Sequence, residues 1–468
     1  MNFKMECARD QETKGIPLDY EHCQNCIWEL TEQQKSKNEQ LASIMPKVPK
    51  YKVKSKPKIT HKKDGTLSAN GDKWFRLLKA NKLPMYFSGD IKVVDGYKEP
   101  NPNSATQVKD WLYALGWEPE EFKYERDKET GDERKIPQVR YSTQGHPRKG
   151  ELTDCVLKLK DKEPGIEVLE GLSIINHRLA VFNSFISNAV KVDGEWRVYA
   201  TVGGLTNTLR FQHRAPIANL PKVGVPWGKE IRACLLCEKN HTMIGSDMVS
   251  LESTTKRHYM EPIDPEYVAL MSEPGFDEHL DLAVFAGAIT ADQAKAHKAK
   301  EADYGNVRQN YKQVNYSAIY GIGAPKLARS TGLSEKDAKK LIEAYWERNH
   351  AVKQVSQEQY VKTLKNGEMW LLNPVSNFYI NLRYEKDIFS SLNQSTGVYC
   401  FDTWVWHCKR MGVDIPMQYH DEIMVQTVDV ERTTNLLQKA IQQTNDKIKL
   451  NVPLAVDVQT GPNYAEVH

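Results

Sequence analysis

The stretch RQNYKQVNYSAIYG, residues 308–321, constrains the fold of this chain more than any other segment. Its polar residues recur every four positions and so form one stripe along an α-helix. They are Arg308, Lys312, Tyr316 and Tyr320, with Gly321 directly after them. The two cations lie in the N-terminal half, where the helix dipole does not favour positive charge. This placement indicates an external anion such as phosphate, which both side chains bind well. The alternative is a solvated helix with two tyrosines in the core.

Carboxylates end two predicted strands elsewhere in the chain. Asp247 ends the strand-like run HTMIGSD, and MQYHDEIMVQ predicts a hairpin with His420 and Asp421 at its turn. Either acid alone would be an ordinary turn residue. Two carboxylates brought together repel each other unless divalent cations lie between them. Beside a phosphate-binding helix, the pair therefore indicates a two-metal phosphoryl transfer site.

Length and charge limit the possible classes of protein. The chain has 468 residues, 40% of them hydrophobic, which predicts about three domains or subdomains at ~150 residues each. The net charge is only +3, so any nucleic-acid surface must be local. Residues 46–63 hold eight lysines, three prolines and no acidic residue. This segment predicts an arm that grips DNA phosphates, a site that recruits a protein, or a flexible solvated loop.

No apolar run approaches the ~20 residues that span a bilayer, and the start MNFKMECARDQETKG lacks the apolar core of a secretory signal. We therefore expect a cytoplasmic protein with no membrane partner. Two CxxC pairs, Cys23/Cys26 and Cys234/Cys237, lack the Gly-rich knuckle typical of zinc ribbons. We expect structural cysteines that pack as small hydrophobes.

Local patterns predict several elements. Residues 17–45 and SEKDAKKLIEAYWERN are expected to be helices, as is NPNSATQVKDWLYALGW, with a capping box between Ser104 and Gln107. The segments GEWRVYATVGG and EIRACLLC are expected to be strands. Residues 124–136 are expected to be a charged surface loop.

Three ordered motifs in the second half of the chain carry a family resemblance. DMVSLES is similar to motif A of family A DNA polymerases, RQNYKQVNYSAIYG matches their R-x3-K-x3-[FY]-x3-YG motif B, and HDE matches their motif C. NPNSATQVKDWLYALGW also resembles the thumb helix of that family, and VDVQTGPNYAEVH resembles the end of its phage members. The chain is similar to the podovirus branch in particular, so the resemblance implies viral DNA replication.

The resemblance implies a metal site. Asp247 and Asp421 would ligate two Mg²⁺ ions, with Mn²⁺ able to substitute, and the backbone carbonyl of Met248 would complete one site. Glu422 would support the metal site or the primer end.

The resemblance also implies a site for the incoming dNTP. Arg308 would bind the outer phosphates, and Lys312 would neutralise the inner ones and protonate pyrophosphate. His279, in the sequence DEHLDLAVF, would be a further phosphate contact. Tyr316 would lie beside the sugar C3′, where a Tyr accompanies easy acceptance of dideoxynucleotides.

Further implied contacts concern the sugar and the DNA. Glu252 would exclude a ribose 2′-hydroxyl, and Tyr320 would stack near the template base and hydrogen-bond to Glu252. Gly321 would let the helix swing. Gln394, in LNQSTG, and Arg210, in TNTLRF, would read minor-groove acceptors, while His420 would lie near the primer terminus.

The sequence departs from the family pattern at three places. Ser253 and Thr254 follow Glu252 where the family has an aliphatic residue and Arg. TNTLRFQHRAPIANLP is a degraded form of another family signature, which leaves Arg210 open between minor-groove contact and plain structural residue. Ser390 replaces an asparagine four positions before Gln394.

The implied fold is an α/β (α+β) right hand with thumb, palm and fingers, its palm built on an antiparallel sheet. Residues 1–175 would form an N-terminal helix and thumb with the lysine-rich insertion 46–63. Residues 176–265 would be the first palm segment, which carries motif A, and residues 266–375 would be the fingers, which carry motif B. Residues 376–468 would be the second palm segment, which carries motif C.

The implied activity is template-directed addition of dNMP to a primer 3′-OH. The chain begins where the polymerase portion of the family begins, so we expect no 3′–5′ exonuclease domain and no intrinsic proofreading. Expected partners are primer-template DNA, dNTPs and possible separate polypeptides: an exonuclease, a processivity factor and a primase-helicase. The competing classes are a single-subunit RNA polymerase, disfavoured by Glu252, and a noncatalytic DNA-binding relative, disfavoured by the intact metal and phosphate residues.

Overall fold

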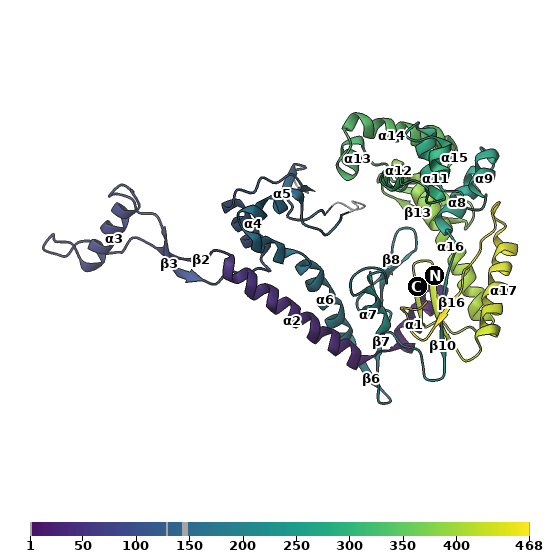
Figure 1. Cartoon of the computed structure of the whole chain (residues 1–468), viewed down its shortest axis with the longest axis horizontal. Helices are drawn as coiled ribbons and strands as arrows, with labels where there is room; N and C mark the ends of the chain where they lie inside the picture. The colour runs from purple at the N-terminus through teal and green to yellow at the C-terminus, as the bar shows by residue number, and fades with distance from the viewer. Residues whose placement is uncertain (1, 128–129, 143–147, 468) are drawn as a thin grey trace. The chain divides into compact units, whose positions relative to one another are not determined.

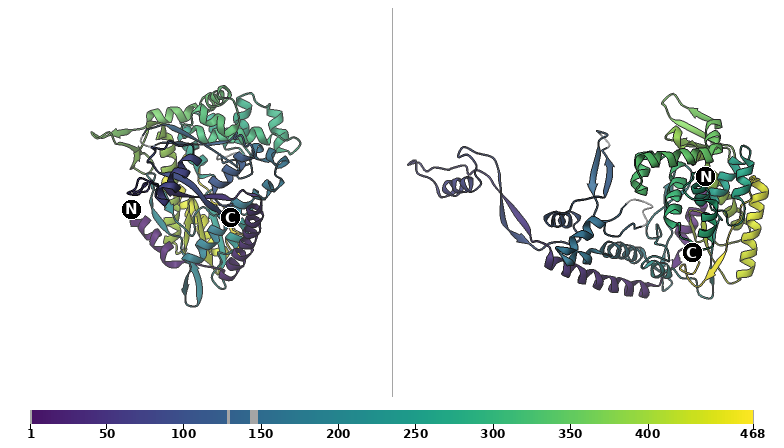
Figure 2. Two further views of the ribbon diagram at one scale, coloured as in Figure 1. Left: turned by 90° about the vertical axis from the view of Figure 1, so that its left-hand side faces the viewer. Right: turned by 45° about the horizontal axis from the view of Figure 1, so that its top comes forward.

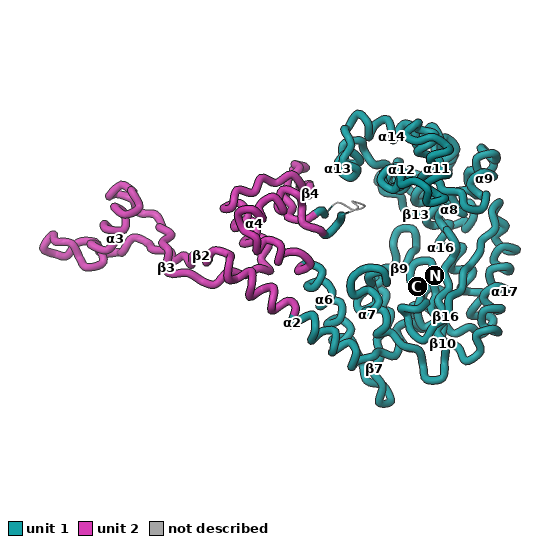
Figure 3. The backbone as a smooth tube through the Cα atoms, viewed as in Figure 1, with its two compact units in different colours: residues 1–32, 141–150, 173–468 teal, residues 33–140, 151–172 magenta. Residues whose placement is uncertain are grey.

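The computed structural model describes residues 2–127, 130–142 and 148–467, and its backbone divides into two compact units (Figures 1 and 3). Unit 1 comprises Met1–Glu32, Tyr141–Gly150 and Ser173–His468, and unit 2 comprises Gln33–Arg140 and Glu151–Leu172. Two helices contain a boundary between the units: α2 (Tyr20–Ile44) and α6 (Leu172–Asn188). Over the described residues, every helix is too short or too polar to cross a bilayer.

Unit 1 holds most of the secondary structure. Its other helices are α1 (Asn2–Lys14), α7 (Gly228–Ala233), α8 (Leu251–Met260), α9 (Pro265–Met271), α10 (Glu278–Phe285), α11 (Ala291–Lys298), α12 (Gly305–Ala318), α13 (Ala324–Thr331), α14 (Glu335–Arg348), α15 (His350–Glu358), η3 (Glu385–Asp387), α16 (Ile388–Arg410) and α17 (Val430–Ile448). Its strands are β1 (Ile16–Pro17), β6 (Val190–Val192), β7 (Glu195–Val198), β8 (Val202–Leu205), β9 (Phe211–His213), β10 (Thr242–Asp247), β11 (Val361–Thr363), β12 (Met369–Asn373), β13 (Phe378–Leu382), β14 (Met417–Tyr419), β15 (Glu422–Thr427) and β16 (Gln459–Gly461).

A four-stranded antiparallel sheet in the order β14-β15-β10-β16 forms the centre of unit 1. Successive strand residues point to opposite faces. Ile244 and Ile423 pack with apolar residues of α16 and α17 on one face, and Figure 2 shows α17, in yellow, along the sheet. Met243 and Met424 pack into a second cluster on the other face. The predicted α+β class and antiparallel sheet are confirmed.

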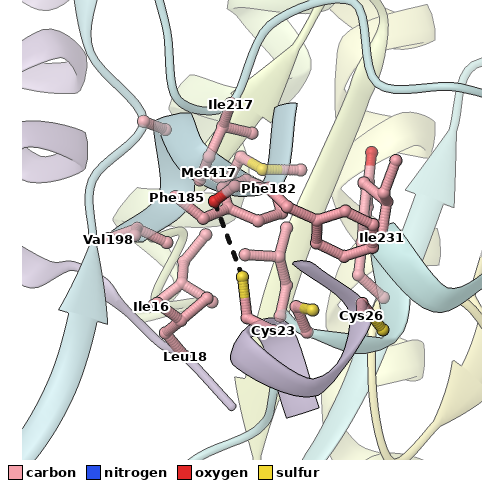
Figure 4. Packing of buried hydrophobic residues seen from close by; sticks show 14 of the residues in the cluster. Ile16, Leu18, Cys23, Cys26, Phe182, Phe185, Val198, Ile217, Ile231 and Met417 are labelled. Atoms are coloured by element: carbon pink, nitrogen blue, oxygen red, sulfur yellow. Dashed lines mark hydrogen bonds between the residues drawn. The ribbon is translucent and has the colours of Figure 1, made fainter. Parts of the chain in front are cut away.

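The second cluster joins the sheet to α2, α6 and α7. Phe182 and Phe185 of α6 lie between Cys23 of α2 and Met417 of the sheet, and the Cys23 thiol donates to the Phe182 carbonyl at 3.6 Å (Figure 4). Both CxxC pairs pack in or against this cluster, so their predicted packing role is confirmed. Burial raises the pKa of the Cys26 thiol to about 11, which keeps the thiol protonated at neutral pH.

The segment EIRACLLC is not the predicted strand. Residues 228–233 form α7, and Ile231, Cys234 and Leu235 are fully buried in the same cluster. Of these three only Ile231 lies within the helix, and Cys234 is its C-cap. Leu235 and Leu236 form isolated antiparallel bridges with Leu18 and Asn463, so the strand prediction holds only at these two residues.

Helix α1 was not expected from the sequence. Lys4, Cys7 and Gln11 are its buried residues, and their spacing of three and four places them on one face. The Lys4 ammonium pairs with Asp402 of α16 at 2.6 Å, and the Gln11 side chain accepts from the Gln418 amide at 3.0 Å. These are polar contacts, so the apolar periodicity that usually reveals a helix is absent here.

Unit 2 contains α4 (Ala105–Ala114), α5 (Asp154–Leu157), η1 (Lys158–Asp161), η2 (Pro164–Leu169) and the hairpin β4 (Phe122–Arg126) and β5 (Glu133–Pro137). The predicted cap of α4 is half right, because Ser104 accepts from the Gln107 amide but the Gln107 side chain accepts from Asn101. Residues 124–136 contain most of this hairpin and are not the predicted loop; residues 128–129 lie outside the described part. Oppositely charged residues such as Glu125 and Arg134 face each other across the two strands of the hairpin. Such pairs stabilise a sheet, so these strands form although their sequence has no apolar pattern.

The predicted lysine arm contributes to a small module within unit 2. Strand β2 (Val48–Lys54) pairs with β3 (Ile91–Lys98), and α3 (Ala69–Ala80) lies between them in sequence. Trp74, Leu78 and Ile91 form its core. Part of the predicted flexible loop is therefore one strand of a two-stranded ribbon. The local sequence did not reveal this strand, because its partner lies nearly 40 residues away.

Candidate active site

The predicted metal-binding aspartates lie together at one end of the central sheet. Asp247 is the last residue of β10 and stands opposite Glu422 in the antiparallel register. Asp421 lies in the turn between β14 and β15, and its carbonyl accepts from the Met248 amide at 3.1 Å. The sheet pairing thus brings together residues that are 174 positions apart in the sequence.

Negative charge accumulates at this point. Partial burial of the Asp247 carboxyl raises its pKa to about 7, and the nearby charges of Asp421, Glu422 and Asp457 act in the same direction. A divalent cation offsets the repulsion between neighbouring carboxylates. The chemistry of this donor set therefore fits a hard cation.

Asp457 is a member of the cluster that sequence reasoning missed. Its side chain accepts from the Asp247 amide at 3.0 Å, and its own amide donates to the Asp247 carbonyl at 3.0 Å. The Ser246 hydroxyl donates to the Asp457 carbonyl at 2.6 Å. The segment VDVQTGPNY, which includes Asp457, has no local pattern that marks this residue as a neighbour of Asp247.

Mg²⁺ would be held by Asp247, Asp421 and the Met248 carbonyl. No three His, Cys, Asp or Glu side chains within the described ranges are arranged as a closed cation site.

Glu422 lies beneath this cluster. Its side chain is buried, and its Oε2 atom accepts from the Tyr464 hydroxyl at 3.2 Å. Burial and the Glu422 charge both raise the pKa of Tyr464, so its hydroxyl stays protonated as the donor. These contacts favour the predicted supporting role of Glu422 over direct contact with a substrate.

The motif B stripe lies on the exposed side of α12. Tyr311, Val314 and Ala318 are buried against neighbouring helices, whereas Tyr316 is 52% and Tyr320 43% exposed. The alternative of two tyrosines in the core is therefore wrong. The two tyrosines are left open to a ligand.

The helix is shorter than the motif. It ends at Ala318, so Tyr320 and Gly321 lie in the turn that follows. Gly321 has a φ of +67°, a left-handed conformation that glycine adopts without strain. Helices commonly end on such a residue.

Arg308 has a partner within the chain, which the sequence did not reveal. Its Nε atom donates to Asp277 Oδ2 at 2.7 Å. Burial alone would raise the pKa of Asp277, but hydrogen bonds from Arg308 and the Leu280 amide lower it below its usual value. Asp277 also caps α10, so the ion pair joins Arg308 to that helix. The guanidinium is therefore oriented by the protein and is not held only by an external anion.

His279 is buried next to the motif B helix. The Asn315 side-chain amide lies 3.1 Å from His279 Nδ1, and the imidazole and Tyr316 ring centroids are 5.6 Å apart. Burial lowers the pKa of His279, and the charges of Arg308 and Lys312 act in the same direction, although those of Glu278 and Asp277 oppose them. A neutral imidazole follows at physiological pH. The Lys312 ammonium lies 5.8 Å from the Tyr316 ring centroid.

Tyr320 has a hydrogen-bond partner other than the predicted Glu252. The Tyr320 hydroxyl accepts from Gln394 Nε2 at 2.7 Å, which joins the end of α12 to α16. Glu252 is held through its backbone carbonyl, which accepts from Asn393 Nδ2 at 3.0 Å. Burial raises the pKa of the Glu252 carboxyl, whereas the positive charge of Arg210 lowers it. The side chains of Glu252 and Arg210 therefore interact electrostatically.

One pocket of about 420 Å³ collects part of the predicted site. Arg308, Lys312 and His279 are not among its lining residues. The predicted residues that line it are Arg210, Glu252, Tyr316, Tyr320, Gln394 and Asp421. They come from segments spread over more than 200 positions of the sequence. The pocket therefore lies between residues of motif A, motif B and motif C.

His420 occupies the hairpin turn with a φ of +60°. Its ring centroid lies 4.3 Å from that of Tyr419 and 5.6 Å from that of His213. Burial lowers the pKa of His213 to about 4, and the nearby positive charges of His420 and Arg210 add to the effect. His213 is thus a neighbour of His420 that the sequence does not reveal, since a lone histidine in a short strand carries no signal.

Comparisons with known proteins agree with this geometry. A sequence profile described as DNA polymerase family A matches residues 90–466. DNA polymerase I of Lactococcus lactis subsp. lactis (strain IL1403) is 26% identical over 281 residues, covering 57% of this chain and 31% of that protein. DNA polymerase I of Helicobacter pylori (strain ATCC 700392 / 26695) is 24% identical over 356 residues, covering 71% and 37% respectively. The chain spans about a third of the length of these curated relatives.

A solved structure shares the fold. The POL domain of Pol1 from M. smegmatis, in complex with DNA primer-template and dNTP, superposes with a TM-score of 0.63 at 17% identity. The match covers 98% of this chain and 69% of that chain.

Proposed function

This chain belongs to DNA polymerase family A, and from this membership we propose that it is a DNA-directed DNA polymerase. It extends a primer 3′-OH with dNTPs on a DNA template and releases pyrophosphate. The observation that carries the proposal is the pocket lined by Asp421, Glu252 and Tyr316, with Asp247 and its carboxylate neighbours at the end of the same sheet.

The chain supplies oriented groups for the triphosphate. Because Arg308 uses Nε for Asp277, its two Nη groups are left to form a fork on the outer phosphates. Lys312, one turn further along α12, holds a proton at Nζ that can pass to the leaving pyrophosphate. Neutral His279 can donate one hydrogen bond from Nε2 to a phosphate oxygen, if its ring moves from its buried position.

The carboxylates act on the primer end. Two Mg²⁺ ions, when bound, would lower the pKa of the primer hydroxyl and neutralise the leaving group. Asp247 and Asp421 would hold these ions. Asp457 hydrogen-bonds to the backbone of Asp247, and the Met248 amide hydrogen-bonds to that of Asp421. Glu252 lines the same pocket as Tyr320 and Arg210, and we assign to it the exclusion of a ribose 2′-hydroxyl.

The finer predictions also belong to the proposal. We assign residues 1–175 to an N-terminal helix and the thumb with its lysine-rich insertion 46–63, residues 176–265 and 376–468 to the palm, and residues 266–375 to the fingers. Action in viral DNA replication, with an exonuclease, a processivity factor and a primase-helicase as separate polypeptides, stays a prediction.

Primer extension tests the proposal. The full chain is incubated with a primer annealed to a DNA template, Mg²⁺, and either dNTPs or rNTPs, and the Asp421→Asn variant serves as the control. We expect extension with dNTPs alone and its loss in the variant. Extension with rNTPs would instead identify an RNA polymerase. No extension, with DNA binding intact, would identify a noncatalytic relative.

A further inference from the structure

Residues 47–98 form a module with its own small core, made of β2, α3 and β3 (Figures 1 and 2). Trp74, Leu78 and Ile91 are buried, and the partly buried side chains around them all lie between residues 75 and 93. The family profile begins at residue 90, so most of the module precedes the matched region. The family membership therefore does not account for what the module does.

The module concentrates the positive charge of the chain. Residues 47–98 contain 14 basic and 4 acidic residues, while the whole chain has a net charge of only +3. The remaining 416 residues are therefore net acidic. A local excess of this size is the electrostatic mark of a polyanion-binding surface.

Few of these charges are neutralised within the chain. The ion pairs recorded for the module join Lys47 to Glu99, Lys52 to Asp95 and Arg76 to Asp72, all through exposed side chains. In the described range 47–98, the other lysines have no ion-pair partner. They are Lys50, Lys54, Lys56, Lys58, Lys62, Lys63, Lys73, Lys79, Lys82, Lys92 and Lys98. Like charges held this close repel each other, so an external anion stabilises their arrangement.

The ribbon presents these charges in a regular row. Lys52 and Lys54 point to the same face of β2, because side chains two residues apart share a face. Their spacing is then about 6.8 Å. That distance equals the rise of two nucleotides along one DNA strand, at about 3.4 Å each. Two ammonium groups at this spacing can contact phosphates of one DNA strand.

The opposite face of the ribbon carries exposed apolar groups between the lysines. Tyr51 and Val94 pair directly across the two strands, and they are 63% and 50% exposed. Tyr97 is 62% exposed on the same ribbon. Lys92 lies on this same face, where it pairs with Val53, so this face also combines exposed apolar groups with an ammonium group. Such a combination can contact the sugars and phosphates of a DNA backbone.

We propose that residues 47–98 form a DNA-binding module that holds the phosphate backbone of duplex DNA without reading its sequence. This binding is separate from the polymerase activity proposed above and needs neither Mg²⁺ nor dNTPs. Lysine contacts to phosphate release counterions, so the module makes DNA binding strongly dependent on salt.

The test measures binding of the full chain to a fluorescent DNA duplex by anisotropy, over a series of NaCl concentrations, with EDTA and without nucleotides. The test variant replaces five module lysines by glutamine: Lys50→Gln, Lys52→Gln, Lys54→Gln, Lys56→Gln and Lys58→Gln. The matched control makes the same change at five exposed lysines elsewhere: Lys336→Gln, Lys339→Gln, Lys340→Gln, Lys353→Gln and Lys439→Gln. Neither set touches the apolar core of the module.

Each phosphate contact contributes about 0.9 to the slope of log K against log[salt]. We expect the module variant to lower this slope by up to about 4.5 and to weaken binding at 150 mM NaCl at least tenfold, since five contacts are at stake. The control variant should keep the slope. A module variant with unchanged slope and affinity would overturn the proposal and indicate an acidic protein as the partner.

A second variant removes the module and keeps the paired ends of the ribbon. Pro49 and Tyr97 face each other across β2 and β3, so an Asn-Gly turn can replace residues 50–96. This variant should show the same loss of salt dependence. Primer extension at low salt and saturating DNA separates the two proposals. If the wild type binds DNA with the expected salt dependence but does not extend a primer, the proposed function is wrong. If the wild type extends a primer but the shortened chain keeps the wild-type salt dependence, the module proposal is wrong.

Discussion

Asp247 is the residue whose ionisation matters most at the site. Its pKa of about 7 lies above the ordinary value of 3.8, so the folded protein keeps a proton that the unfolded chain releases. The stability linked to this proton is present below pH 4 and is lost as the pH rises through about 7. In EDTA, Asp247→Asn should therefore melt at a higher temperature than the wild type at pH 8, and the two should converge at pH 4.

Thermal unfolding followed by circular dichroism measures this difference. Added Mg²⁺ should stabilise the wild type at pH 8 but not Asp247→Asn, because the ion binds the deprotonated carboxylate. Equal melting temperatures at pH 8 without metal would contradict the crowding of carboxylates that we infer.

Asp277 is a positioning residue for Arg308. Asp277→Asn keeps a side-chain oxygen that can cap α10 but loses the ion pair at Arg308 Nε. A less ordered guanidinium should bind the triphosphate more weakly, so we expect KM for dNTPs to rise about threefold to tenfold, as expected for ~1 kcal/mol. Steady-state kinetics with kcat and KM reported separately measures the effect. An unchanged KM together with a loss of kcat of similar size would show that Asp277 does not act through binding of the triphosphate.

At the scale of single elements, α1 depends on polar contacts for its place on α16. Burial raises the pKa of Asp402 to about 6, and the Lys4 charge at 2.6 Å opposes the rise. Lys4→Met leaves a buried carboxylate without its partner. We expect it to lower the free energy of unfolding by about 3 kcal/mol at pH 8.

The pH dependence of this loss has a definite sign. Without Lys4 the pKa of Asp402 rises further, so below about pH 6 the carboxyl is protonated and the cost falls. Chemical denaturation at pH 8 and pH 5 measures both values. Adding Asp402→Asn to Lys4→Met should recover some of the stability at pH 8; a loss that is equal at both pH values would mean that packing alone is at stake.

The end of α12 is a second element whose geometry matters. Gly321 has a left-handed φ, and a Cβ there would lie 3.1 Å from Lys386 Cδ. Gly321→Ala should therefore cost about 1–2 kcal/mol. Equilibrium unfolding in urea measures this cost, and Gly332→Ala, with a similar φ but open space around it, is the matched control for the backbone conformation. An equal cost at both positions would mean that Lys386 moves aside freely.

At the scale of the whole molecule, the charges are unevenly distributed. Replacing residues 50–96 removes 12 basic and 4 acidic residues and changes the net charge from +3 to −5. Association with DNA at low salt should then slow by about tenfold or more, because electrostatic steering is lost. Stopped-flow mixing with labelled duplex measures the rate. The wild-type and shortened chains should have similar rates at high salt, and a difference that persists there would point to contacts other than charge.

The sequence by itself determined what depends on short-range spacing. The four-residue period of the motif B stripe, the turn at Asp421 and the cap of α4 by Ser104 are local patterns, and the structure has each of them. Period and cap act within a few residues, so no other segment of the chain is needed to predict them.

Only the tertiary structure decided which distant groups share a site. It joined Asp457 to Asp247, Asp277 to Arg308, and β3 to the lysine-rich β2. These contacts depend on how sheets and helices pack, and their partners carry no mark in the local pattern. A charged residue looks the same in sequence whether it lies in solvent or beside a partner, and burial and pairing give it its role.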